Sequence, residues 1–127
     1  MNTPEAAIRA YFKELNGSDP EGTVAVFAED GSLMAEEAPT ATGHEQLRHF
    51  FTGLFKAVSF ARELHIDRII EAGDLATAQT HTTGTLTMLE PNTTIALISR
   101  ELFVLRKTGS QWRIADYMFN HQERAGS

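Results

Sequence analysis

Apolar side chains in the first half of the chain recur every three or four residues, the spacing at which they share one face of an α-helix. The pattern predicts helices over residues 3–16, 19–30 and 42–58. Each segment begins at or beside a residue that caps helix N-termini well. In the third segment, Thr42 followed by Glu45 matches a capping box, in which the Glu45 side chain reaches back to the backbone N–H of Thr42.

In the second half of the chain the spacing changes to the alternation of β-strands. It predicts four longer antiparallel strands, over residues 64–70, 75–89, 93–105 and 111–120, besides a short strand over residues 32–35. Helices followed by a meander of strands define an α+β domain. The helices should pack on one face of a bent sheet, because their apolar stripes have no other surface to cover.

The strand that contains Glu101 places a carboxylate among apolar side chains. By alternation, Glu101 shares one face with Phe103 and Leu105, and the opposite face is also mostly apolar. A strand of this kind lies deep in a sheet. A buried carboxylate is costly unless it is paired with an Arg or Lys, hydrogen-bonded or protonated. Glu101 is therefore the strongest functional candidate in the sequence.

Composition and charge narrow the class of protein. The 127 residues make one domain, 1–127, with enough chain for a hydrophobic core. The absence of cysteine excludes disulfides, thiolate catalysis and cysteine metal sites. A net charge of −6 argues against nucleic acid or a membrane as the main partner. With no membrane-length apolar run and no signal peptide at the start, we expect a cytoplasmic protein.

Five segments together resemble one protein family. They are AYFKELNGSD, VFAEDGSL, TGHEQLRHFF, AGDLATAQT and RELFVLRKTGSQWRIADY, and they span essentially the whole chain. They are similar, in order and spacing, to the SnoaL-like and ketosteroid-isomerase-like branch of the nuclear transport factor 2-like superfamily. The resemblance implies a cone-shaped roll of about three N-terminal helices on a strongly curved antiparallel sheet. It also implies an apolar pocket inside the cone, and a homodimer joined through the outer sheet face.

The resemblance implies an oxyanion hole, a pair of hydrogen-bond donors for a developing negative charge. Tyr11 lies eight positions before Asp19, at the distance of the family's oxyanion-hole tyrosine. Glu101 falls where the family has a protonated acid. The structural alternatives are a core tyrosine with a locally satisfied hydroxyl, and an ion-paired Glu101.

The catalytic base that the resemblance implies is less well matched. An ungapped match places it on Ala35, and one gap would bring Glu36 or Glu37 to that position. Both acids are otherwise solvated loop residues. His81 is a further candidate for proton transfer, because imidazole titrates near neutral pH.

The predicted pocket wall combines apolar and polar side chains. The candidate ligand-binding residues are Phe27, Met34, Phe51, Phe55, Gln79, Thr83, Phe103, Tyr117 and Phe119. Gln79, His81 and Thr83 share the strand face that the resemblance turns toward the pocket, although the same pattern also describes a solvent-facing side. We expect a volume on the order of a few hundred Å³, and no cofactor or metal.

Two functions follow from these residues. The first is a cofactor-free enzyme that moves a proton on a small, apolar carbonyl compound, by isomerase or cyclase-type chemistry. The second is a non-catalytic module that binds an apolar ligand. The pair of Tyr11 and Glu101 favours the enzyme, whereas Ala35 at the position of the base favours the binding module.

Overall fold

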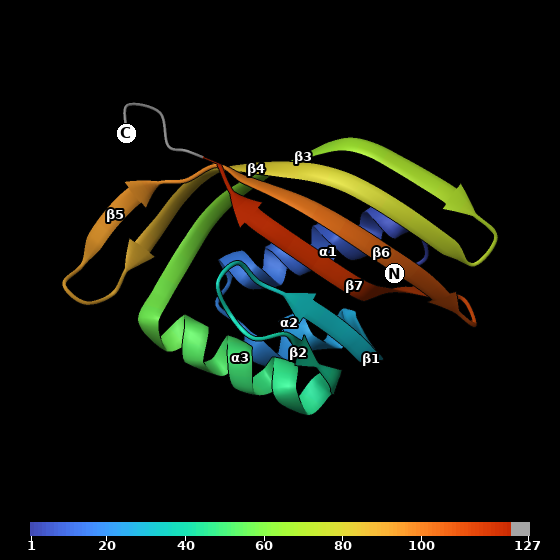
Figure 1. Ribbon diagram of the computed structural model, residues 1–127, viewed down its shortest axis with the longest axis horizontal. Coiled ribbons are helices and arrows are strands. Elements are labelled where there is room, and N and C mark those ends of the chain that lie inside the picture. Colours follow the sequence, from blue (N-terminus) through green and yellow to red (C-terminus); the bar gives the residue numbers. More distant parts are fainter. Residues whose placement is uncertain (123–127) are drawn as a thin grey trace.

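Three helices pack on one face of a curved seven-stranded sheet in the computed structural model, which describes residues 1–122 (Figure 1). The helices are α1 (Pro4–Asn16), α2 (Pro20–Ala25) and α3 (Gly43–Ala57). The strands are β1 (Phe27–Met34), β2 (Ala41–Thr42), β3 (Val58–Ala72), β4 (Leu75–Met88), β5 (Thr93–Ala96), β6 (Ser99–Thr108) and β7 (Gln111–His121). The predicted α+β class is confirmed.

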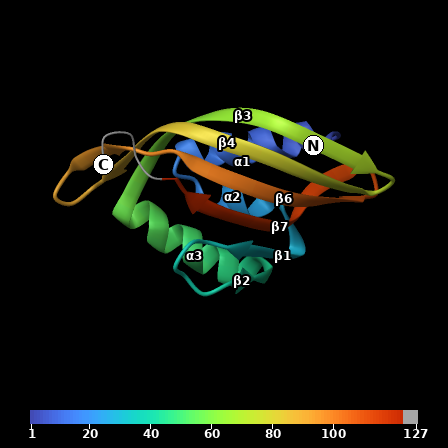
Figure 2. The same ribbon diagram turned by 45° about the horizontal axis from the view of Figure 1, so that its top comes forward.

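The sheet is mixed, whereas the sequence predicted antiparallel strands throughout. The strand order is β2-β1-β7-β6-β4-β3, and β5 pairs with β4 beside this path. β1 runs parallel to β7, and the other neighbours are antiparallel. In Figure 2 the sheet arches over α1 and α2, and its other face is turned away from all three helices. The sheet therefore has an inner and an outer face with different surroundings.

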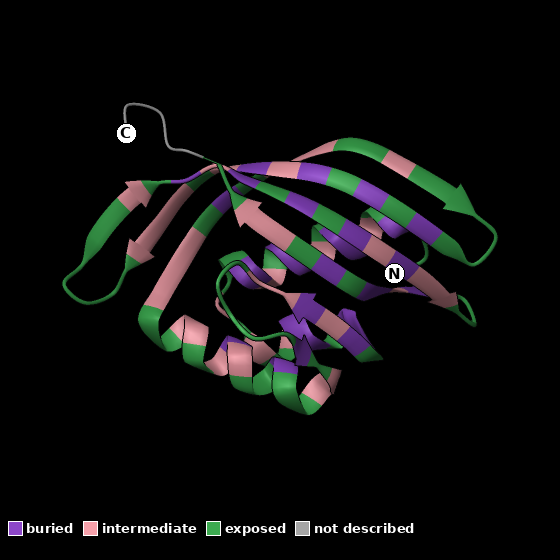
Figure 3. Ribbon diagram, in the orientation of Figure 1, coloured by how far each residue is buried: buried purple, intermediate pink, exposed green. Residues whose placement is uncertain are grey.

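The core lies between the helices and the inner sheet face. Burial alternates along β4 and β6, so that successive residues face the core and the outside (Figure 3). The largest side chains that are fully buried include Ile8 of α1, Phe51 of α3 and Phe103 of β6. Among the described helices, none is long and apolar enough to cross a membrane.

The second helix is shorter than the sequence pattern predicts. α2 ends at Ala25, and Phe27 already begins β1. Phe27 is the partner of Ile114 in the parallel pairing of β1 with β7, and both side chains are fully buried. Strand pairing and burial therefore outweigh the local helical spacing over residues 27–30.

The predicted capping box at the start of α3 is also wrong in detail. Thr42 is the N-cap residue, but its side chain makes no capping hydrogen bond. The backbone N–H of Thr42 donates to Gln46 Oε1 over 2.9 Å, so Gln46 takes the part expected of Glu45.

The predicted strand 93–105 is divided into β5 and β6, which pair with β4 on either side of Gly84. Gly84 has a φ of +116°, and a Cβ there would lie 2.1 Å from the carbonyl oxygen of Ala61, so the close approach of β3 and β4 requires glycine. The Leu97 N–H donates to the Gly84 carbonyl oxygen over 3.0 Å. β5 and β6 both run antiparallel to β4, and in the short break between them the Leu97 carbonyl oxygen lies 2.8 Å from Arg62 Nη1.

Candidate functional site

A small cavity of about 50 Å³ lies between the helices and the inner sheet face. Its apolar wall is formed by Phe12, Leu15, Phe50, Phe51, Leu54, Phe60, Leu97 and Phe119. Its polar wall is formed by Tyr11, Arg62, Thr82, Ser99, Glu101, Tyr117 and His121. The volume is far below the predicted few hundred Å³, because aromatic side chains from α1, α3, β6 and β7 fill most of the cone.

Glu101 is buried at the polar end of this cavity, as predicted, with 5% of the residue exposed. Thr80 Oγ1 donates to one carboxyl oxygen over 2.8 Å, and Thr82 Oγ1 donates to the other over 2.9 Å. Desolvation raises the pKa of Glu101 above that of an exposed glutamate, although both threonine hydrogen bonds and the nearby Arg62 oppose the shift. The carboxyl group therefore retains its proton to a higher pH than usual.

Arg62, which the sequence analysis did not single out, is buried beside Glu101 with 8% of the residue exposed. Its Nη2 donates to Thr82 Oγ1 over 3.0 Å and to Ser99 Oγ over 3.2 Å, while Nη1 donates to the Leu97 carbonyl oxygen. Thr82 thus bridges the guanidinium and the carboxyl group, which are not in direct ion-pair contact. Burial lowers the pKa of Arg62, and the charge of Glu101 opposes this shift.

Tyr11 lies in the centre of the aromatic cluster and also lines the cavity. Its ring meets that of Phe12 edge-on, with centroids 4.9 Å apart, and that of Tyr117 with centroids 5.0 Å apart. Burial raises the pKa of Tyr11, and the neighbouring Tyr117 opposes the rise. The Tyr11 hydroxyl carries one hydrogen that it can donate to an acceptor.

His121 and Glu36 lie where the cavity meets the surface. His121 belongs to the cavity wall although the residue is largely exposed, and its Nδ1 lies 3.0 Å from Ser99 Oγ. The backbone N–H of His121 donates to Glu36 Oε2 over 3.4 Å. Burial lowers the pKa of the imidazole, Glu36 raises it, and Arg62 lowers it further.

The structure brings five of the predicted site residues to the cavity wall. These are Tyr11, Phe51, Glu101, Tyr117 and Phe119. Phe27 and Phe103 are fully buried core residues that do not reach the cavity, and Phe55 packs against Phe51 beside it. Glu37 is an exposed loop residue with a φ of +57°, away from the wall.

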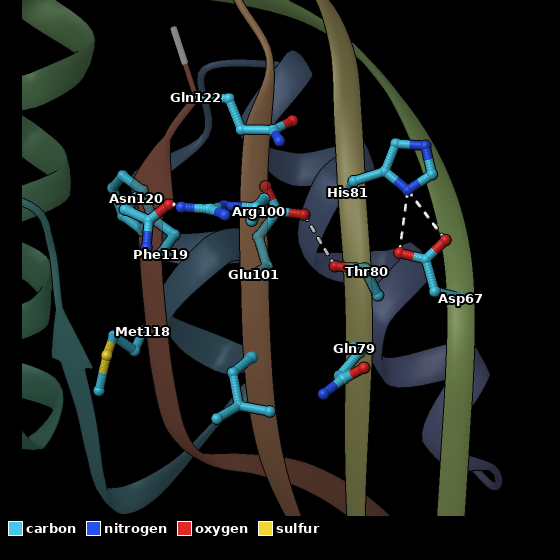
Figure 4. A pocket seen from close by; sticks show the side chains of 11 residues that line it. Asp67, Gln79, Thr80, His81, Arg100, Glu101, Met118, Phe119, Asn120 and Gln122 are labelled. Carbon is cyan, nitrogen blue, oxygen red and sulfur yellow. Dashed lines mark hydrogen bonds and ion pairs between the residues drawn. The ribbon is translucent and has the colours of Figure 1, made fainter.

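The remaining predicted residues lie on the outer sheet face, which corrects their assignment to the inner pocket. His81 and Gln79 line an open groove of about 620 Å³ there (Figure 4). His81 Nδ1 lies 2.9 Å from both carboxylate oxygens of Asp67, and its ring stacks on that of His65. Met34, paired with the exposed Met118, also lies on this side, and Thr83 has its hydroxyl 3.3 Å from the outward-facing His65.

The prediction for β4 turned the wrong set of alternating side chains toward the pocket, although the sequence indicates the correct set. Ala76 and Ala78, the small apolar residues of the strand, are buried, and strand alternation then turns Thr80 and Thr82 inward. Gln79, His81 and Thr83 form a polar run on the other face, which is equally typical of a solvent-facing side. Within residues 1–122, no three His, Asp or Glu side chains gather as metal ligands would.

Comparisons with known proteins identify the family. The family model of the SnoaL-like domain matches residues 8–122, so the chain belongs to the SnoaL-like domain family. No curated protein matches the chain. A ketosteroid isomerase-like protein from Erwinia carotovora atroseptica SCRI1043 is similar in structure, with 29% identity, 94% of both chains covered and a TM-score of 0.90.

More distant structures share the fold. A putative aromatic ring hydroxylase from Novosphingobium aromaticivorans has 20% identity, with 94% of this chain and 87% of the other covered and a TM-score of 0.81. A protein with a cystatin-like fold from Nostoc punctiforme PCC 73102 has 19% identity, with 94% and 78% covered and a TM-score of 0.72. The predicted cystatin-like, nuclear transport factor 2-like fold is confirmed.

Replacing Arg62 should test the buried network. Arg62→Met leaves the buried acceptors of Thr82, Ser99 and Leu97 without their donor, so we expect a loss of about 3 kcal/mol in the free energy of unfolding. The measurement is urea unfolding at neutral pH. Arg68→Met, an exposed change on the same strand, is the control and should alter stability by less than about 0.5 kcal/mol. Equal stability of the two variants would contradict the assigned role of Arg62.

The pH dependence of stability should reveal Glu101. Its folded-state pKa is raised above the unfolded value of about 4.3, so the folded state binds the proton more tightly. This contribution to stability is fully present below the unfolded pKa and is lost as the pH rises through the folded pKa. Glu101→Gln should flatten that decline in urea unfolding, whereas exposed Glu71→Gln should preserve it. An NMR titration that places the Glu101 carboxyl at or below about 4.3 would refute the prediction.

Proposed function

We propose that the protein binds a small, mostly apolar carbonyl compound in the inner cavity and catalyses proton transfer on it without a cofactor. The observation that carries the proposal is the division of one cavity into an apolar wall of aromatic and aliphatic side chains and a polar end. Tyr11 and Glu101 are among the polar residues that line it. Isomerisation and cyclase-type reactions both belong to this class.

The chemistry rests on stabilising an enolate, the anion formed when a carbon beside a carbonyl group loses a proton. Protonated Glu101 has one O–H to donate, even while Thr80 and Thr82 donate to its oxygens. Tyr11 lines the same cavity and supplies a second donor through its hydroxyl. Two fixed donors in a site with little water stabilise developing charge more strongly than water does.

The size of the cavity limits the ligand. A volume of about 50 Å³ admits only a few heavy atoms without rearrangement. Phe50, Leu54, Phe60 and Phe119 are half-buried wall residues, and displacing them would enlarge the space toward the surface. We therefore expect either a very small carbonyl compound or a larger one that moves these side chains on binding.

Binding without catalysis is the second candidate function. Both carboxyl oxygens of Glu101 already accept hydrogen bonds, which supports a structural part for this residue. Ala35, at the position that the family resemblance assigns to the base, supports the same alternative. A protein of this kind would retain a ligand in the cavity and leave its carbon-bound protons unchanged.

Deuterium exchange on cyclohexanone distinguishes the two candidates. In D₂O the enzyme should exchange the protons beside the carbonyl faster than buffer alone, as followed by ¹H NMR. Tyr11→Phe removes one oxyanion donor and should slow the exchange on the order of a hundredfold. Binding seen by protein NMR with no exchange above buffer would favour the non-catalytic module. An equal loss in His81→Gln would place the reaction on the outer face and contradict the proposal.

We also propose that two copies of the chain associate through the outer sheet face. Leu102 and Met118 are paired in register on that face, and 44% and 46% of these residues are exposed. Sedimentation velocity should show a dimer at micromolar concentration, and Leu102→Glu should shift it toward monomer. Leu89→Glu, which changes an exposed apolar residue outside this face, should leave the dimer intact. A wild-type monomer at that concentration would contradict the proposal.

A further inference from the structure

His121 is an imidazole in the same cavity wall as the two proposed donors. It is the last residue of β7, next but one to Phe119, and it lines the cavity together with Tyr11 and Glu101. Its largely exposed position gives it contact with both solvent and the cavity. A group that accepts a proton from a bound ligand and later releases it needs contact with that ligand. Neither Glu36, Glu37 nor His81 belongs to the cavity wall.

We propose that His121 accepts the proton from the ligand carbon in the inner cavity, with Ser99 and Glu36 as its positioning residues. This inference rests on the proposed function. It assigns the base to the end of β7, whereas the family resemblance places it near Ala35.

The hydrogen bond to Ser99 orients the ring. Within residues 1–122, the imidazole hydrogen bond of His121 runs through Nδ1 to Ser99 Oγ, which leaves Nε2 for a ligand. Ser99 Oγ accepts one hydrogen bond from Arg62 and keeps a second lone pair and its own hydrogen. It can therefore accept from Nδ1–H when Nε2 acts as the base, and it continues to accept when the ring is an imidazolium.

The charges around His121 come from three elements. Arg62 of β3 and the His121 imidazole meet at Ser99, and Arg62 disfavours the imidazolium. Glu36, in the loop after β1, lies beside the His121 backbone and favours the imidazolium. Glu101 of β6 lines the same cavity, and burial raises the pKa of its carboxyl group, which favours the neutral form. Together these groups leave the His121 imidazole neutral at neutral pH, so that it can act as a base. Once the imidazole has accepted a proton, the Glu36 carboxylate stabilises the imidazolium.

The proton balance closes within the site. His121 Nε2 takes the proton, the C–H bond beside the ligand carbonyl breaks, and its electron pair becomes the enolate, whose oxygen accepts hydrogen bonds from Tyr11 and Glu101. The imidazolium then returns the proton to the same carbon or to a conjugated carbon. In D₂O the N–H of the exposed imidazolium exchanges with solvent, so that return to the same carbon delivers deuterium. Return to a conjugated carbon gives isomerisation. No oxidant or other reactant is consumed.

The test uses the full chain, cyclohexanone as the probe, and NMR for both exchange and binding. His121→Gln should lower the exchange rate by a factor on the order of a hundred to ten thousand while the probe still binds. His49→Gln, an exposed histidine of α3, is the matched control and should retain the wild-type rate. In ¹⁵N-histidine-labelled protein, the probe should shift the Nε2 resonance of His121 more than that of Nδ1.

Glu36→Gln tests the positioning role through the pH profile. Removing the carboxylate destabilises the imidazolium and lowers the pKa of His121, so the pH at which exchange rises should move downward. A residue with a purely structural part would leave that pH unchanged.

The outcomes separate this inference from the proposed function. If the wild-type protein exchanges the probe and His121→Gln retains the full rate, the assignment of His121 is overturned while the proposed function stands. If the wild-type protein binds the probe without exchange, the catalytic proposal fails and the role of His121 fails with it. If the probe binds and the Nε2 resonance does not respond, the inference is overturned whatever the rate.

Discussion

The burial of the Arg62 guanidinium is the constraint on which the rest of the site depends. A buried charge of this kind costs several kcal/mol unless it is paired and hydrogen-bonded. Its acceptors are the Leu97 carbonyl oxygen, Thr82 and Ser99, and the N–H of Leu97 in turn donates to the Gly84 carbonyl oxygen of β4. The position of the Arg62 guanidinium therefore depends on the backbone and side-chain acceptors that surround it. They hold the three strands β3, β4 and β6 in a single arrangement at the polar end of the cavity.

The aromatic side chains between the helices and the sheet fill most of the space that a ligand would need. The rings of Phe103 and Tyr117 are parallel with centroids 4.2 Å apart, and Tyr11 packs edge-on against both. Such packing stabilises the domain, and it reduces the inner cavity to about 50 Å³. The polar groups at its end are nevertheless arranged in one hydrogen-bonded chain, from His121 through Ser99, Arg62 and Thr82 to Glu101. The site is therefore small, but its polar side chains are held in place by a continuous chain of hydrogen bonds.

The polar side chains of β4 point to both faces of the sheet and take part in different interactions on each face. Thr80 and Thr82 belong to the inner network, whereas Gln79 and His81 belong to the outer groove. A shift of one residue exchanges these sets, because successive side chains of a strand point to opposite faces. The outer face keeps exposed Leu102 and Met118 beside polar groups, a composition that suits association more than it suits the core.

The sequence by itself determined the class of fold, the order of its helices and main strands, and the burial of Glu101, because periodicity and alternation are local properties of the chain. It did not determine that residues 27–30 form a strand, since that follows from the distant pairing of Phe27 with Ile114. Nor did it identify Arg62 or His121, whose importance comes from acceptors and neighbours contributed by other strands. Only the tertiary structure decided which polar side chains share the cavity, because long-range pairing sets the phase of each strand relative to the helices.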